Sequence, residues 1–212
     1  AVGAAIAAKF LAAHTGNPTF NRETIYTYIS DGGIQEEISL GAARIAGKLE
    51  LDNLIMFYDA NEIQLSTETG DVMNEDTGAK YRAMGWEVFE IDGNDVAQIR
   101  TAIEAAQKVV GKPTLIIGRC IMGKGALKAD GSSYERSCKT HGAPLGGDAY
   151  VNTVKNLGGD PENPFVIFDD VKEIYTKRAA ELEAIAAERH AEEEEWAKAN
   201  PEMAAKQAQW FS

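Results

Sequence analysis

The stretch 26-YTYISDGGIQEEIS-39 contains a strand, a sharp break and the start of a helix. Its first half is aromatic and β-branched, as strands are, and this pattern stops at Asp31-Gly32-Gly33. Apolar residues then recur at helical spacing from Ile34 to Leu49. A carboxylate and two glycines at the tip of a strand fit either a plain turn or a phosphate or metal site, so the rest of the chain must decide.

The alternation of helix and strand continues on both sides of this stretch. Strands are expected at 23–30, 51–61, 86–93 and 114–122, and helices at 2–13, 34–49, 74–84 and 95–109. The second strand is continuously apolar from Leu54 to Tyr58, which is typical of a strand covered on both faces. The order predicts an α/β fold, with a parallel sheet and helices on both of its faces.

The character of the chain changes after residue 122. Residues 123–150 are rich in glycine with little periodicity, and a long loop in a compact domain is often functional. A long charged C-terminal helix is expected over 169–197, and Asn200-Pro201 ends it before a short last helix. We therefore expect an α/β domain over 1–168, incomplete at its start, and a helical extension over 169–212 leading towards a further domain.

Net charge, cysteine content and the length of apolar runs limit the classes of protein to which this chain can belong. A net charge of −12 argues against a nucleic-acid partner, since phosphate backbones are met by clustered Lys and Arg. Two cysteines, Cys120 and Cys138, are interpreted as free thiols in a reducing cytoplasm. No apolar run approaches the roughly 20 residues of a membrane span. Residues 1–13 resemble the interior of a buried helix, so we expect further residues before Ala1.

Two polar residues follow successive strands. Asp31 comes just after the strand at 23–30, and Asn61 comes just after the next one. The carboxyl ends of parallel strands share one edge, where ligands bind, so both side chains can point to one spot. Their oxygens, with a backbone carbonyl, suit Mg²⁺, and Gly32 and Gly33 let an anion approach the start of the 34–49 helix. A pair of ordinary turns remains the alternative.

The surrounding motifs resemble the transketolase family. Asp-Gly followed about 30 residues later by the Asn of "YDAN" is similar to the thiamine-diphosphate signature, Gly-Asp-Gly and then Asn. Further similarity comes, in the same order along the chain, from "SDGGIQEEIS", "ARIAGKLELDNLIMFYDANEI", "YRAMGWEVFEIDGND", "KPTLIIGRCIMGKGA" and "HGAPLG". The resemblance covers nearly the whole chain and implies the thiamine-diphosphate-binding fold.

The resemblance also implies roles for particular residues. Asp31, Asn61 and the backbone carbonyl of Ile63 would bind Mg²⁺ or Ca²⁺. Thiamine diphosphate would be contacted by Ser30, Gly32, Gly33, Asn61, Leu65, Met122 and His141. His141, in "HGAPLG", is similar to the family histidine near the diphosphate and the substrate, and is the catalytic candidate. Two departures stand out: Ser30 replaces the first glycine of the signature, and "ADGSSYERSCKT" before His141 looks longer than usual.

The function implied by the resemblance is ketol transfer. A two-carbon unit would pass from a ketose phosphate to an aldose phosphate in the pentose phosphate pathway, with the cofactor as electron sink. We expect a homodimer, with the remaining transketolase domains as partners and no activity of this stretch alone. Alternatives are 1-deoxyxylulose-5-phosphate synthase, phosphoketolase, and a non-catalytic partner domain, which loss of Asp31 or Asn61 would have favoured. A nicotinamide-binding Rossmann domain is rejected, because no helix follows "GKG" at 123–125.

Overall fold

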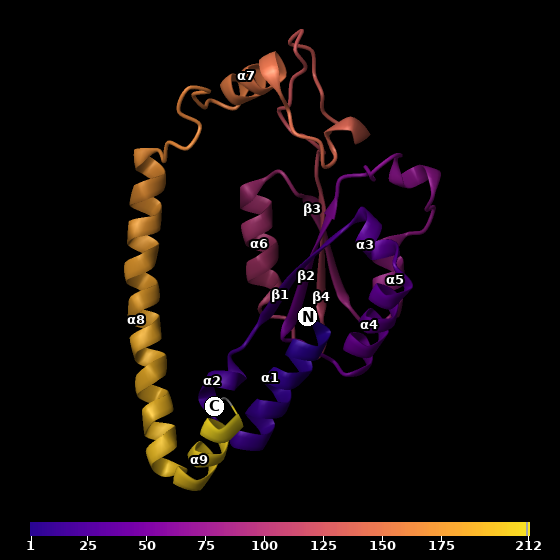
Figure 1. Ribbon diagram of the computed structural model, residues 1–212. Coiled ribbons are helices and arrows are strands. Elements are labelled where there is room, and N and C mark those ends of the chain that lie inside the picture. The colour runs from indigo at the N-terminus through magenta and orange to yellow at the C-terminus, as the bar shows by residue number, and fades with distance from the viewer. Residues whose placement is uncertain (211) are drawn as a thin grey trace. The chain divides into compact units, whose positions relative to one another are not determined.

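The computed structural model describes residues 1–210 and 212, which divide into two compact units (Figure 1). Unit 1 comprises Ala1–Val2 and Ile25–Pro164, and unit 2 comprises Gly3–Thr24 and Phe165–Ser212. Each unit is described by itself below. The predicted domain limits, 1–168 and 169–212, stay a prediction.

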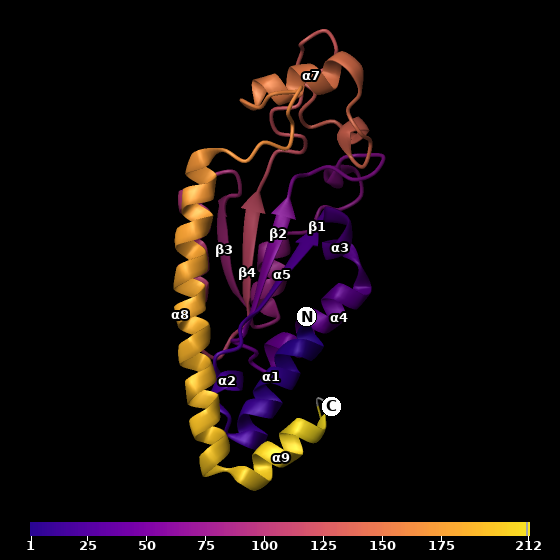
Figure 2. The same cartoon turned by 60° about the vertical axis from the view of Figure 1, so that its left-hand side comes forward.

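Unit 1 is built on a parallel sheet. Its strands are β1 (Ile25–Ser30), β2 (Leu54–Ala60), β3 (Glu87–Asp92) and β4 (Thr114–Arg119), in the order β1-β2-β4-β3. Figure 2 shows the strands side by side with their carboxyl ends at one edge. The parallel sheet predicted from the sequence is confirmed, and the ends of β1 and β2 are neighbours because Ser30 lies opposite Asp59.

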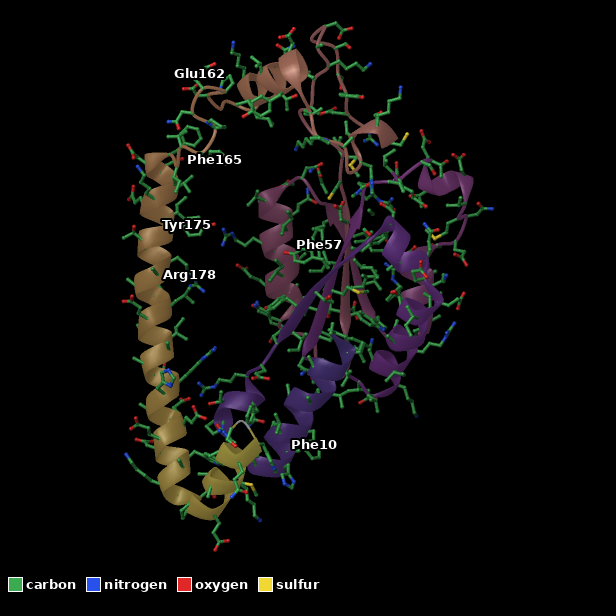
Figure 3. The ribbon with its side chains drawn as sticks, in the orientation of Figure 1. Phe10, Phe57, Glu162, Phe165, Tyr175 and Arg178 are labelled. Carbon is green, nitrogen blue, oxygen red and sulfur yellow. The ribbon has the colours of Figure 1, made fainter. Side chains whose placement is uncertain are left out.

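Helices cover both faces of this sheet, as predicted (Figure 1). On one face, α6 (Val96–Ala106) buries Ala102 and Ala106 against Ile55 and Ile116, with Phe57 packed beside them (Figure 3). The other face carries α3 (Asp31–Gln35), α4 (Glu37–Lys48) and α5 (Thr77–Ala83). Helix α4 is tied to the residue before β3, because the buried indole N–H of Trp86 donates to the carbonyl of Ala43 at 2.9 Å.

The single helix predicted over 34–49 is wrong, because two helices replace it. Glu36 is extended, with φ −64° and ψ 131°, and separates α3 from α4. The first of these helices already begins at Asp31, so Gly32 and Gly33 lie inside it rather than before a long helix. The two glycines, both poor helix formers, are consistent with a helix that stops after five residues.

The glycine-rich region after β4 has more structure than predicted. Residues 127 and 133 form an antiparallel bridge, which makes a hairpin with Asp130-Gly131 at its tip. A short 3₁₀ helix, η2 (Cys138–Thr140), and an α-helix that the sequence did not predict, α7 (Gly147–Asn156), follow. A second 3₁₀ helix, η1 (Thr69–Asp71), lies in the loop after β2.

Unit 2 is formed by residues from the beginning and from the end of the described chain. It holds most of α1 (Val2–Thr15), α2 (Pro18–Asn21), the long helix α8 (Asp169–Ala199) and α9 (Pro201–Trp210). Asn17 is fully buried and donates through its amide to Glu193 and to Gln207, both at 3.2 Å. The first half of α8 is exposed, and Tyr175 and Arg178 extend from one side of it (Figure 3).

Two further predictions concern the whole chain. Cys120 and Cys138 are both free thiols, as predicted. Within the described residues, every helix is too short or too polar to cross a membrane.

Candidate functional site

Asp31 is a buried carboxylate at the carboxyl edge of the sheet. It follows β1 directly, lies in the first turn of α3 and is only 2% exposed. Its Oδ1 accepts a hydrogen bond from the Tyr58 hydroxyl at 2.7 Å. Its Oδ2 accepts from the backbone N–H groups of Asn61, at 3.0 Å, and Glu62, at 3.2 Å. The ends of β1 and β2 are therefore joined through this one side chain.

The partners of Asp31 are all neutral donors. A carboxylate offers about four lone-pair positions, of which three are used here, so one remains for a further ligand. A buried charge is costly unless it is paired or binds a metal. In the described part of the chain Asp31 has no ion pair with Lys, Arg or His, so its surroundings fit a bound cation.

Asn61 and Ile63 form a tight turn beside Asp31. Asn61 follows β2, is 7% exposed and accepts the N–H of Ile63 on its Oδ1 at 3.0 Å. Ile63 lies opposite Glu68 in an antiparallel bridge whose hydrogen bonds are made by the neighbouring residues, from Thr69 to Glu62 and from Gln64 to Thr67. The Ile63 carbonyl therefore takes no part in this pairing.

These groups match the chemistry of a hard cation. One carboxylate, one amide oxygen and one backbone carbonyl are ligands that Mg²⁺ accepts, with its other positions left to water or a phosphate. The described residues contain no group of three or more His, Cys, Asp or Glu that could hold a metal ion. A metal ion at this position would therefore be held by oxygen donors of mixed type rather than by a cluster of acidic side chains.

Tyr58 is a site residue that the sequence analysis missed. It is 4% exposed, and burial, followed by its hydrogen bond to Asp31, raises the pKa of its hydroxyl. The hydroxyl thus stays a donor to the carboxylate at neutral pH. Because Tyr58 ends a continuous apolar run, the sequence indicated only a buried strand position.

Gly32 leaves room next to Asp31. A Cβ atom built on Gly32 would meet no protein atom within 4 Å, so packing inside unit 1 does not require a glycine there. Because glycine has no side chain, this open space lets a ligand such as a diphosphate approach the main chain closely. At Gly33, by contrast, a Cβ would come within 3.0 Å of the Ile29 side chain, so that glycine also serves packing.

The other predicted site residues lie on separate loops. Leu65 is 74% exposed in the loop after β2. Met122 follows β4, and its carbonyl accepts the N–H of Arg136 at 2.9 Å. His141 is partly exposed directly after η2, and within the described residues its buried Nδ1 has no hydrogen-bond partner. Hydrogen bonds therefore connect Asp31 to Asn61 and Asn61 to Ile63. Among the described residues, no side-chain hydrogen bond runs from these three residues to Leu65, Met122 or His141.

Two cavities open at this edge of the sheet. One of about 410 Å³ is lined by Asp31, Tyr58 and Glu62 together with residues of the 68–78 segment. The other, of about 550 Å³, lies over the ends of β3 and β4 and is lined by Glu62, Arg119, Lys124 and Arg136 among others. Glu62 and Arg119 line both cavities, together with Ala60 and Glu90, so the two cavities are adjacent.

A family model described as transketolase, thiamine diphosphate binding domain, matches residues 1–212. The chain belongs to the transketolase family. It is 36% identical over 181 residues to transketolase 2 of Xanthobacter flavus, an alignment that covers 84% of this chain and 26% of that protein. It is 35% identical over 205 residues to dihydroxyacetone synthase of Pichia angusta, covering 95% and 28% of the two chains.

Solved transketolases share the fold of this chain. The crystal structure of a Pichia stipitis transketolase in complex with sedoheptulose-7-phosphate superposes with a TM-score of 0.88 at 31% identity, covering 96% of this chain and 30% of that one. The chain thus spans about a quarter to a third of the length of the transketolases it matches. The resemblance and the fold predicted from the sequence are confirmed.

One departure from the transketolase signature is tolerated by the backbone. Ser30 stands where the signature has its first glycine, and its φ of −105° and ψ of 176° are extended values that any residue adopts. The segment 129–140 before His141, for which we expected a second departure, folds as the end of the hairpin and η2 described above.

Proposed function

We propose that this chain supplies the metal and diphosphate half of the site of a transketolase that depends on thiamine diphosphate and Mg²⁺. The reaction would transfer a two-carbon ketol unit from a ketose phosphate to an aldose phosphate, a step of the pentose phosphate pathway. The observation that carries the proposal is the buried Asp31 carboxylate, which accepts hydrogen bonds from three neutral donors and, among the described residues, has no ion pair.

The chain's own residues have distinct tasks in this proposal. Asp31, Asn61 and the Ile63 carbonyl would hold Mg²⁺ or, in its place, Ca²⁺, and Tyr58 would fix the Asp31 carboxylate by hydrogen bonding. Ser30, Gly32 and Gly33 would face the diphosphate, and Leu65 and Met122 would be apolar walls against the cofactor. When bound, thiamine diphosphate supplies the nucleophile and the electron sink for ketol transfer.

The test of this function is an Asp31→Asn variant of the intact native protein that contains this chain. Asparagine keeps the shape but loses the charge, and removing even an outer-shell partner typically lowers metal affinity about 10- to 100-fold, so we expect a loss of at least about 100-fold. Calorimetric titration with Mg²⁺ and thiamine diphosphate, beside an assay of ketol transfer between sugar phosphates, measures this loss of affinity.

The matched control is Asp148→Asn, which changes an exposed aspartate in the first turn of α7. Unchanged affinity in Asp31→Asn would exclude the metal role, and a parent protein that binds no thiamine diphosphate would exclude the function.

His141 is proposed to act at the diphosphate and substrate end of the site. The residue is partly exposed, and its buried Nδ1 has no hydrogen-bond partner among the described residues, which fits a residue that hydrogen-bonds a ligand better than one that fills a core. His141→Ala should then lower turnover by about 10²- to 10⁴-fold while changing the melting temperature little. A large fall in melting temperature with normal kinetics of the folded enzyme would make His141 structural.

We also infer the setting in which this chain works. The remaining transketolase domains and a second subunit are the proposed protein partners, since the chain corresponds to only part of the relatives it matches. A cytoplasmic location is supported by two free thiols, which suit a reducing compartment.

A further inference from the structure

Two loops meet at the carboxyl edge of the sheet next to the candidate metal site. One follows β2 and carries the 61–63 turn, and the other follows β4 and runs to η2. Their strands are neighbours in the sheet, and the Cys120 N–H donates to the carbonyl of Ala60 at 3.1 Å. The loops therefore start side by side, and a contact between them farther out would add to the hydrogen bonds with which Asp31 and Asn61 hold the 61–63 turn.

The loop after β4 is well braced inside unit 1. Its hairpin is closed by the N–H of Tyr134 to the carbonyl of Ala126 at 2.8 Å. Helix α7 supports it through three side chains on one face, which bond to backbone groups of the loop: Asn152 to Lys128, Thr153 to Leu127 and Asn156 to Gly125. A loop held this firmly can act as a fixed support for a neighbour.

Arg136 extends from this braced loop to the 61–63 turn. Its guanidinium lies 3.7 Å from the Glu62 carboxylate, and both side chains line the 550 Å³ cavity. Glu62 is the residue between Asn61 and Ile63, and its own N–H donates to Asp31. A contact that restrains the Glu62 side chain therefore also restrains the turn that presents the proposed metal ligands.

The backbone of both partners is unusual. In the part of the chain that the structure describes, positive φ occurs at three non-glycine residues, Glu50, Glu62 and Arg136. Two of these three form this ion pair, with φ of 66° at Glu62 and 54° at Arg136. Such conformations persist only where surrounding contacts fix them, and they occur preferentially at functional sites.

We propose that Arg136 is a positioning residue for the metal-binding turn and acts through Glu62. This inference rests on the proposed function, because it assigns the turn to Mg²⁺. Arg136 lies in the segment between β4 and His141, outside the residues assigned to the metal ion or the cofactor.

The direction in which Arg136→Gln changes Mg²⁺ affinity distinguishes a positioning role of Arg136 from a purely electrostatic one. A lone cation near the site repels Mg²⁺, so if Arg136 acted only as a charge, Arg136→Gln would bind Mg²⁺ more tightly. If it positions the turn, the same variant binds Mg²⁺ more weakly. Because the pair is more than half exposed, the expected loss is modest, about two- to five-fold.

The experiment uses the intact native protein and its Arg136→Gln, Glu62→Gln, double and Arg136→Lys variants. Mg²⁺ titrations at fixed thiamine diphosphate should show weaker binding in both single variants, no further loss in the double variant and recovery in Arg136→Lys. The control is Arg119→Gln, which removes the same charge from the same cavity but breaks an ion pair with Glu90 instead. It should not weaken Mg²⁺ binding.

A second measurement needs neither metal nor cofactor. Hydrogen exchange of the 61–69 backbone should be faster in Arg136→Gln than in the parent and unchanged in Arg119→Gln. Unchanged exchange in Arg136→Gln, or Mg²⁺ binding as tight as in the parent, would overturn the positioning role. Absence of Mg²⁺ and thiamine diphosphate binding in the parent would instead contradict the proposed function, and the exchange experiment would still decide whether Arg136 holds the turn.

Discussion

Two tyrosines in unit 1, Tyr58 and Tyr81, are both buried, but they differ in the hydrogen bonding of their hydroxyl groups. The Tyr58 hydroxyl donates to Asp31 at 2.7 Å, whereas the buried Tyr81 hydroxyl has no partner among the described residues. The two side chains are otherwise alike in burial, at 4% and 1% exposure. The same substitution at each position therefore separates the loss of a site contact from the loss of a buried hydroxyl.

Tyr58→Phe should weaken Mg²⁺ binding by about 10-fold, because residues that orient a metal ligand typically contribute this much. Tyr81→Phe should leave Mg²⁺ binding unchanged and keep or raise the stability, since it removes a buried group without a hydrogen bond. Calorimetric Mg²⁺ titration and urea unfolding of both variants provide the comparison. Equal Mg²⁺ affinities in the two variants would show that Tyr58 does not orient Asp31.

At this scale the sequence predicted the proximity of Asp31 and Asn61 better than it predicted the residues that contact them. Asp31 and Asn61 could be placed together because parallel strands end at one edge, and the structure joins them by hydrogen bonds. Tyr58 and Glu62 could not be recognised from the sequence. A tyrosine at the end of an apolar run looks like a core residue, and a glutamate in a turn looks like a surface charge until its partner, 74 positions later at Arg136, is known.

Helix α4 lies against the start of β3 through a glycine. A Cβ atom built on Gly47 would overlap the backbone carbonyl oxygen of Met84, which a rotamer change cannot relieve. Gly41, on the same helix, has no atom within 4 Å of the same built position. The two glycines thus differ only in whether the helix packs closely at that point.

Gly47→Ala should destabilise unit 1 by about 1–3 kcal/mol, the usual cost of overpacking, or more because backbone must move. Gly41→Ala should stabilise it by up to about 1 kcal/mol, since alanine is the better helix former. Urea unfolding of both variants tests this. A Gly47→Ala protein as stable as the parent would mean that α4 is not held against residues 84–86.

Element boundaries were predictable where periodicity was strong and not where the site interrupts it. The strands and α6 follow clear patterns and are confirmed. The break at Glu36 and the early start of α3 at Asp31 contradict the predicted 34–49 helix, because apolar spacing continues across a backbone that changes direction. Helix α7 lies in a glycine-rich stretch whose composition favoured a loop.

On the scale of the whole molecule, unit 2 is formed by segments from both ends of the described chain. Asn17 connects them, because its amide donates to Glu193 in α8 and Gln207 in α9 while its oxygen caps α2. Arg22 adds an ion pair with Glu192 at 2.6 Å. No pattern in the sequence could have predicted these contacts, which join residues more than 165 positions apart.

Asn17→Ala should loosen unit 2 by about 1–3 kcal/mol, because it removes a helix cap and the two hydrogen bonds that the buried Asn17 amide donates. Hydrogen exchange should become faster over residues 188–210 and remain unchanged in the sheet of unit 1. Gln209→Ala, at an exposed position of α9, is the control and should have no effect. Faster exchange in the sheet as well would show that the two units do not unfold independently.

The central claim is that Asp31, Asn61 and the Ile63 carbonyl hold the metal ion that binds the diphosphate. The most direct test is a crystal structure of the intact native protein grown with thiamine diphosphate and Mn²⁺, which replaces Mg²⁺ and can be located by its anomalous scattering. We predict one anomalous peak within coordinating distance of all three oxygens and of the diphosphate. A diphosphate bound without such a peak, or with the metal ion held by other residues, would contradict the account.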